Sequence, residues 1–253
     1  LIGVSTYMMK TSVSAKADQL QVMANGRSSA VIEKIDRNFY ERFGDVQAFA
    51  FNKLAVEAAS SRMRNDEIDQ FINTMVSYYV LYDLMMICDN NGKVIATNTK
   101  DKNGNLVKTG FLIGKDFSNE EWHRLSISGR GPEGGAWYSD FMENPDVSRI
   151  YNRMGSGMGF AAPIRDSTGT AVGVWYNFAN WTDVTTGIRT ETENAIKESQ
   201  PGAFILITND KDAVIDSDDP AMILKTHVSL EGWNENASFQ YQGKNINSND
   251  YLI

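Results

Sequence analysis

The chain has no proline before Pro132, and the residues from Val13 to about Ser60 follow the pattern of one long amphipathic helix. Apolar residues recur at intervals of three, four and seven from Val13 to about Ser60. Such a helix exceeds the usual length of about 11 or 12 residues, and its early turns have little neighbouring sequence to pack against. We therefore expect it to pair with a second copy of itself, which would make the protein a homodimer.

The rest of the sequence changes to the pattern of a sheet flanked by helices. A second helix is expected from about Asn65 to Tyr79, and apolar runs on both sides of Asn91-Gly92 predict a β-hairpin. Ser118 and Glu121 form a capping box for a short helix. Further strands are expected at 136–141, 159–164 and 170–178, and a linking helix from 182 to about 199. The predicted fold class is α+β, with an antiparallel sheet.

An internal repeat divides the sheet region into modules. Residues Met85–Ile95 align without a gap on Ile205–Ile215, and both stretches read as an apolar strand, a polar turn and a second apolar strand. This predicts two related modules in tandem, the second incomplete at the C-terminus. We expect four parts: two helices in 1–79, a ligand-binding module in 80–181, a linking helix in 182–200 and a truncated module in 201–253.

Composition narrows the possible functions. The chain has 24 Lys and Arg against 32 Asp and Glu, a net charge of -8, and no run rich in basic residues, so we expect no nucleic acid partner. Its one cysteine, Cys88, lies in an apolar run and is predicted to be a buried structural thiol. His123 and His227 are the only histidines, and the common hydrolytic and phosphoryl-transfer motifs are missing, so we expect no enzyme.

Other motifs have simpler explanations than the sites they resemble. The stretch 129–134 matches G-x-G-x-x-G but lacks the preceding strand and following helix of a dinucleotide site, so it is expected to be a loop. Residues 101–105 begin like a calcium loop, but the required glycine and bidentate acid are replaced by leucines, which predicts a turn. The acids within 216–219 can bind a cation or form a solvated turn or helix cap. We expect neither a metal nor a cofactor.

Aromatic and polar side chains are concentrated in the first module. Alternation along a strand puts Trp175 and Asn177 on one face, and a second strand likewise pairs Tyr138 with Asp140. Two strands that each present an aromatic side chain and a polar one can orient a small molecule in a pocket. The same pattern also fits aromatic core residues and a surface acid.

The order of these elements resembles the double Cache sensor domains of bacterial receptors, most of them chemoreceptors (methyl-accepting chemotaxis proteins). Ile87–Asn98 is similar to the first hairpin of that family, Leu112–Ser118 with Trp122 to its pocket-side helix start, and Ala162–Val174 to its last hairpin. The resemblance covers nearly the whole chain and implies two PAS-like modules after a long helix. It also implies a periplasmic position on the inner membrane, flanking membrane helices outside this sequence, and signal transduction for chemotaxis.

The resemblance further implies a ligand set. Members that bind amino acids carry Arg two residues before a Trp-aromatic pair, then Tyr-x-Asp, then Asp on the last strand. With Trp175 added, the candidate site is Glu120, Trp122, His123, Tyr138, Asp140, Trp175 and Asn177. Glu120 replaces the carboxylate-binding Arg and Asn177 replaces the last acid, so an amine or amino-acid-like ligand is expected. The alternatives are the sensor domain of a histidine kinase or diguanylate cyclase that binds a small carboxylate, and a binding or adhesion module without signalling.

Overall fold

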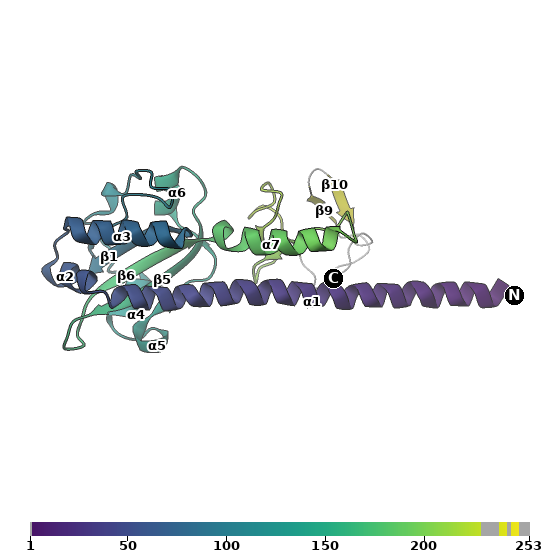
Figure 1. Cartoon of the computed structure of the whole chain (residues 1–253), viewed down its shortest axis with the longest axis horizontal. Helices are drawn as coiled ribbons and strands as arrows, with labels where there is room; N and C mark the ends of the chain where they lie inside the picture. The colour runs from purple at the N-terminus through teal and green to yellow at the C-terminus, as the bar shows by residue number, and fades with distance from the viewer. Residues whose placement is uncertain (1, 229–237, 242–243, 248–253) are drawn as a thin grey trace. The chain divides into compact units, whose positions relative to one another are not determined.

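The computed structural model describes residues 2–228, 238–241 and 244–247 (Figure 1). The chain divides into two compact units, one of residues 37–184 and the other of residues 1–36 and 185–253. The module predicted at 80–181 lies inside the first of these units. Helices and an antiparallel sheet confirm the predicted α+β class. Among the described residues, no helix is long and apolar enough to cross a bilayer.

The N-terminal helical region contains three helices. They are α1 (Ile2–Ala50), α2 (Lys53–Ser61) and α3 (Asp66–Tyr79). The prediction of one helix to about Ser60 is therefore wrong, because Asn52 has extended backbone angles and its side chain accepts a hydrogen bond from Leu54 N at 2.9 Å. Asn65 caps α3 in the same way, accepting from Ile68 N at 2.8 Å, which confirms the predicted start of that helix. Asparagine is a favoured N-cap because its side chain satisfies a backbone N–H of the first turn.

The unit of residues 37–184 is built around one antiparallel sheet. Its strands follow the order β2-β1-β6-β5-β3, and β4 also pairs with β5. The strands are β1 (Tyr82–Asp89), β2 (Val94–Thr97), β3 (Trp137–Tyr138), β4 (Met142–Glu143), β5 (Ser156–Arg165) and β6 (Ala171–Asn180). The predicted hairpin around Asn91-Gly92 is confirmed, with Gly92 at a φ of 84°.

Short helices in the connections complete this unit. They are η1 (Gly110–Leu112), α4 (Glu121–Ile127), α5 (Pro132–Gly135) and α6 (Pro145–Tyr151). The capping box predicted for α4 is wrong: the helix begins at Glu121, its N-cap Glu120 makes no capping side-chain bond, and Ser118 N donates to Asp116. Two residues of α5 have non-helical angles, so the glycine-rich stretch 129–134 is a loop in its backbone geometry, as expected.

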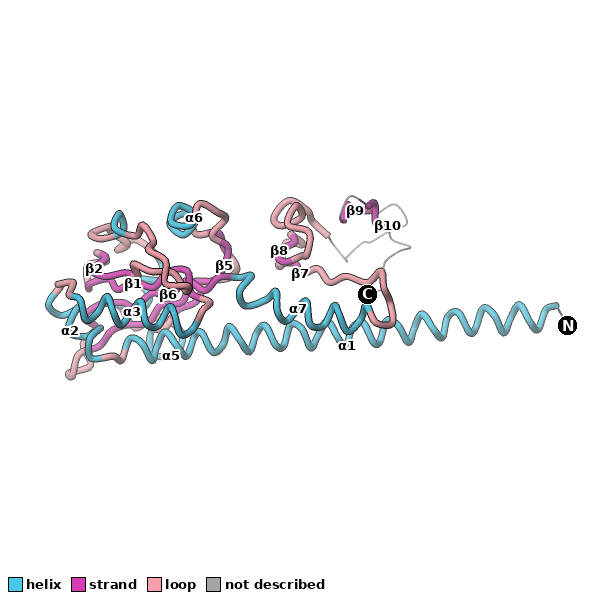
Figure 2. Tube along the Cα trace, turned by 45° about the horizontal axis from the view of Figure 1, so that its top comes forward, coloured by secondary structure: helices cyan, strands magenta, loops and turns pink. Residues whose placement is uncertain are grey.

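The sheet has two faces with different coverings. The face that contains Trp175 packs against the helices: the Trp175 ring lies 5.7 Å from Phe49 of α1 and 5.9 Å from Phe71 of α3. We call it the helix face. The opposite face, which we call the loop face, contributes Tyr176 and its neighbours to a core that also includes Leu112, Trp122 and Val147. In Figure 2, strands β1, β5 and β6 accordingly lie between α6 and the helices α1 and α3.

In its described residues, the second unit has the N-terminal part of α1, a linking helix and two small hairpins. The elements are α7 (Trp181–Lys197), which begins in the first unit, β7 (Ile207–Thr208), β8 (Val214–Asp216), β9 (Ser238–Tyr241) and β10 (Lys244–Asn247). Strands β7 and β8 form the antiparallel hairpin that the repeat predicts. Asp216 is buried and pairs with Arg189 at 3.2 Å, so the expectation of a solvated turn is wrong for this residue.

The internal repeat is visible in the turns. Asp89 Oδ1 accepts from the backbone N–H groups of Asn91 and Lys93, each at 2.9 Å. Asn209 Oδ1, at the aligned position, accepts from the N–H groups of Lys211 and Ala213, each at 3.0 Å. The same turn recurs outside the repeat, where the acceptors are Asp101 and Asp166. Among the described residues this turn therefore occurs at four places, of which Asp89 and Asn209 are the two aligned by the repeat, and the stretch 101–105 is one of the other two.

Candidate functional site

Three of the predicted site residues belong to the start of α4. Trp122 is buried on the loop face, where its ring lies 4.7 Å from the ring of Tyr176. His123 is also buried, and its Nε2 lies 3.1 Å from the carbonyl oxygen of Asp89. Glu120, just before the helix, is exposed. The two aromatic side chains are thus part of the packed core beside the sheet.

Trp175 and Asn177 lie on the helix face, opposite Trp122. Both are completely buried, and Trp175 Nε1 donates to Asn177 Oδ1 at 2.6 Å. The alternation that places these two side chains together also directs Tyr176, between them, to the loop face. The predicted shared face of Trp175 and Asn177 is confirmed, but the sheet separates them from α4.

Tyr138 and Asp140 are near the edge of the same sheet. Tyr138 pairs with Phe160 across the strands and packs edge-on against Phe43 of α1, at a centroid distance of 5.7 Å. About half of the Tyr138 side chain is exposed, and Asp140 beyond it is exposed too. Of the two strand aromatics predicted to line a pocket, Trp175 is therefore covered by helices and Tyr138 packs against α1 with about half of its surface exposed. The structure does not bring the predicted residues together into one site.

A polar cavity of about 480 Å³ provides a different candidate site in the same unit. It is formed by the start of β1, the loop after β2, the turn after α6, and the junction between β6 and α7. The lining residues are Asp83, Asp101, Lys102, Asn103, Tyr151, Arg153, Met154, Ser156, Asn180, Thr182 and Asp183. We call it the Asp83 cavity, because Asp83 is its buried charged group.

Asp83 is held by three hydrogen-bonding groups. Arg153 Nη2 lies 2.8 Å from both carboxylate oxygens, and Asn180 Nδ2 donates to Oδ2 at 2.8 Å. Tyr151 Oη donates to the Asp83 carbonyl oxygen at 2.8 Å. Burial raises the pKa of the Asp83 carboxyl above its ordinary value of 3.8, although the Asn180 hydrogen bond and the Arg153 charge lower it. The carboxylate is therefore incompletely compensated for its loss of water.

The remaining charges of the cavity are more accessible. Lys102 Nζ pairs with Asp183 Oδ2 at 2.5 Å, and 33% of the Lys102 side chain and 26% of the Asp183 side chain are exposed. The carboxylate of Asp101 is occupied by the backbone of its own turn. The lining thus has more carboxylates than cations, and only Asp83 among its charged side chains is buried. Such an arrangement can bind a small polar molecule through charge-assisted hydrogen bonds.

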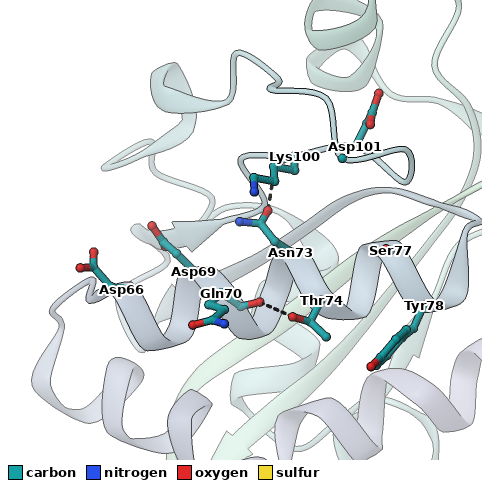
Figure 3. A pocket seen from close by; sticks show the side chains of 10 residues that line it. Asp66, Asp69, Gln70, Asn73, Thr74, Ser77, Tyr78, Lys100 and Asp101 are labelled. Carbon is teal, nitrogen blue, oxygen red and sulfur yellow. Dashed lines mark hydrogen bonds between the residues drawn. The ribbon is translucent and has the colours of Figure 1, made fainter.

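A groove of about 580 Å³ lies between α3 and the loop after β2 (Figure 3). Its lining is Asp66, Asp69, Gln70, Asn73, Thr74, Ser77, Tyr78, Lys100, Asp101 and Gly104. Asn73 Oδ1 is occupied by the N–H groups of Thr99 and Lys100, and Asp69 pairs with Arg64. None of the lining side chains is buried. Because a desolvated polar group strengthens binding, the Asp83 cavity is the better candidate.

The sequence contains a signal for this cavity that the site prediction did not use. Asp83 is the one charged residue in the apolar run from Val80 to Cys88. A carboxylate in a buried strand requires a cation or several donors, so a partner could have been sought. Arg153 is that partner, and it lies 70 residues further along the chain.

Comparisons with known proteins agree with this architecture. Neither a family model nor a curated protein matches the sequence. Solved structures do match: the sensor domain of the Vibrio cholerae histidine kinase DctB is 17% identical, with a TM-score of 0.59 over 82% of this chain and 70% of that one. This chain has the fold of that sensor domain.

Two further structures support the same fold. A domain of a sensory box/GGDEF family protein from Vibrio parahaemolyticus has a TM-score of 0.60 at 11% identity, covering 82% of this chain and 75% of that one. The ligand-binding domain of the Pseudomonas aeruginosa PAO1 amino acid chemoreceptor PctC, in complex with GABA, has a TM-score of 0.50 at 12% identity, covering 83% and 79%. At these identities the likeness concerns the fold, and the ligand has to be argued from this chain.

Proposed function

We propose that this chain is the extracytoplasmic sensor domain of a transmembrane chemoreceptor and binds a small polar molecule in the module 80–181. The Asp83 cavity is the observation that supports this proposal: a concave space of about 480 Å³ with a buried carboxylate held by Arg153 and Asn180, in a Cache-type fold. In this proposal, residues 1–79 form the N-terminal helical part, residues 182–200 the linking helix and residues 201–253 the second, membrane-proximal module.

The charges of the cavity favour a ligand with an amine. An ammonium group hydrogen-bonded to Asp83 would replace part of the hydration that burial removes from this carboxylate, and Asp183, paired with Lys102, is a second carboxylate in the same lining. A ligand with only carboxylates would have to displace Asp83 from Arg153 or Asp183 from Lys102. An amine or amino-acid-like molecule is therefore the proposed class. GABA, bound in the PctC structure, has both an amine and a carboxylate, and is a suitable first probe.

The membrane context and the partners are part of the proposal. We infer a homodimer formed through α1, anchored in the inner membrane by helices outside this sequence, with no enzymatic activity of its own. The second candidate function is the sensor domain of a histidine kinase or diguanylate cyclase, because two structures with TM-scores of 0.59 and 0.60 belong to a histidine kinase and a sensory box/GGDEF protein.

A thermal-shift screen followed by calorimetric titration tests the proposed function. Small amines and amino acids should stabilise the chain, since a ligand at a hundredfold excess over its Kd adds about 2.7 kcal/mol. Asp83→Asn should weaken binding by tenfold or more, the factor expected for a charged hydrogen bond of about 1.5 to 3 kcal/mol. Asp140→Asn is the matched control: it neutralises an exposed acid of the same module and should bind normally.

Several outcomes would contradict the proposal. Loss of binding in Asp140→Asn with normal binding in Asp83→Asn would place the ligand at the residues predicted from the sequence. If only dicarboxylates or sugars stabilise the chain, the proposal that the ligand carries an amine is wrong. Turnover of any compound would refute a purely sensory role.

A further inference from the structure

Asn180 connects the Asp83 cavity to the start of α7. Its Nδ2 donates to Asp83 Oδ2 at 2.8 Å, while its Oδ1 accepts from Asp183 N at 3.1 Å and from Thr182 Oγ1 at 2.8 Å. The side chain is buried, with 3% of the residue exposed. One planar amide group therefore binds the carboxylate of the cavity with one end and the first turn of the helix with the other.

The helix end of this amide acts as an N-cap. The first backbone N–H groups of a helix have no partner within the helix, and a side-chain oxygen that accepts from one of them stabilises the start. Because Oδ1 and Nδ2 belong to the same rigid amide, a rotation that releases Asp83 also moves the oxygen away from Asp183. The cap of α7 and the bonding state of Asp83 are thus geometrically linked.

We infer that Asn180 is the positioning residue through which occupancy of the Asp83 cavity reaches α7, an inference that rests on the proposed function. A ligand ammonium at Asp83 competes with Asn180 for the same carboxylate. When the ligand replaces the Nδ2 donor, the capping oxygen loses the contact that fixes its orientation. A ligand shifts such an equilibrium only through its different affinity for the two arrangements, and this competition provides that difference.

The rest of α7 can carry a change at its start along the chain. The helix continues without a break from Trp181 to Lys197. In its second half Arg189 binds Glu193 at 2.8 Å and Asp216 of β8 at 3.2 Å, and all three side chains are almost fully buried. A helix that is held to β8 by a buried ion pair passes a displacement to that strand, because a buried pair is costly to break.

Hydrogen exchange in a double-mutant cycle tests this role without a ligand. Asp83→Ala removes the acceptor of Asn180. Asn180→Ser keeps a capping oxygen but lacks the Nδ2 group that donates to Asp83 Oδ2, and its single hydroxyl hydrogen is on the capping oxygen itself. The measured quantity is the exchange rate of the Asp183 backbone amide, which donates to Asn180. The Ile68 amide, which donates to the N-cap Asn65 of α3, is the internal reference. In the native background, Asp83→Ala should speed Asp183 exchange about fivefold, the factor of a typical cap. With Ser at position 180, the same change should have no effect.

Two results would overturn the inference: unchanged Asp183 exchange in Asp83→Ala, or an equal increase in both backgrounds. If Asp83→Ala does not fold, Asp83→Asn replaces it, because the neutral acceptor weakens the bond to Asn180 and should give a smaller increase with the same dependence on Asn180. The calorimetric titrations test the proposed function, and the exchange cycle tests only the link between Asp83 and the cap of α7. If the cycle gives the expected exchange rates but no amine binds, the proposed function is refuted and the Asn180 linkage is kept.

Discussion

Arg153→Met is the substitution for which the structure makes the most detailed energetic prediction. The change keeps an apolar side chain of comparable reach beside Tyr151 but removes the guanidinium from Asp83. The Asp83 side chain is 6% exposed, so water cannot replace the lost contacts, and Asn180 Nδ2 becomes the main remaining donor to the carboxylate.

The expected cost is moderate because the arginine itself is partly exposed. A hydrogen bond to a charged group contributes about 1.5 to 3 kcal/mol, and breaking a fully buried ion pair costs about 3 to 5 kcal/mol. Because 42% of the Arg153 side chain is exposed to solvent, we expect the cost of breaking this pair to be close to that of a charged hydrogen bond and below that of a fully buried ion pair. We predict a loss of about 1.5 to 2 kcal/mol in the free energy of unfolding at about pH 7.

The pH dependence identifies the cause of this loss. Burial already raises the folded-state pKa of Asp83 above 3.8, and Arg153 lowers it, so the variant has a still higher pKa. A carboxyl with a raised folded-state pKa favours folding most below its unfolded value, and this contribution is lost as the pH rises through the folded value. The difference between variant and native chain should therefore be greatest at neutral pH and shrink as the pH falls toward 3.8.

Urea unfolding followed by tryptophan fluorescence measures the free energy of unfolding of the unit 37–184. Four of the five tryptophans lie in this unit: Trp122, Trp137, Trp175 and Trp181. Arg64→Met is the control, because it removes an arginine from the more exposed Asp69 and should cost at most about 1 kcal/mol. An Arg153→Met loss that equals the control, or that stays the same at about pH 7 and about pH 4, would refute the reasoning.

Two further substitutions test a buried hydrogen bond between β1 and α1 and a buried ion pair in the second unit. Tyr82→Phe should cost about 1 kcal/mol in the same assay, because the Tyr82 hydroxyl donates to Asp45 at 2.9 Å from a buried position, and no loss would show that this bond contributes nothing. Arg189→Ala should destabilise β8 by about 3 kcal/mol, since it leaves Asp216 buried without its cation. Exchange of the β8 amides measures this, with the exposed Lys34→Ala as a control that should change nothing; equal exchange in both variants would contradict the prediction.

Local signals predicted much of the fold. Asn65 before an apolar periodic stretch and Asn91-Gly92 between two apolar runs each fix a backbone conformation, and the structure confirms both elements. The break at Asn52 was missed because apolar periodicity continues through α2, so the pattern is the same with or without a cap between the helices. Periodicity records which face is buried and not whether the helix is continuous.

The site depends on long-range packing that the sequence does not reveal. Alternation correctly put Trp175 and Asn177 on one face, but which face the helices cover is decided by tertiary structure. The covering of the loop face by Trp122 likewise depends on the path of the long connection after β2. The pairing of Asp83 with Arg153 joins residues 70 positions apart, and no local pattern specifies it.

A crystal structure of the chain with the amine that most raises its melting temperature tests the central claim most directly. The account predicts an ammonium nitrogen about 3 Å from the Asp83 carboxylate, in the Asp83 cavity, with the Asn180 amide turned away from Asp83. Ligand density beside Tyr138 and Asp140, or an unchanged Asp83–Asn180 contact with the ligand elsewhere, would contradict it.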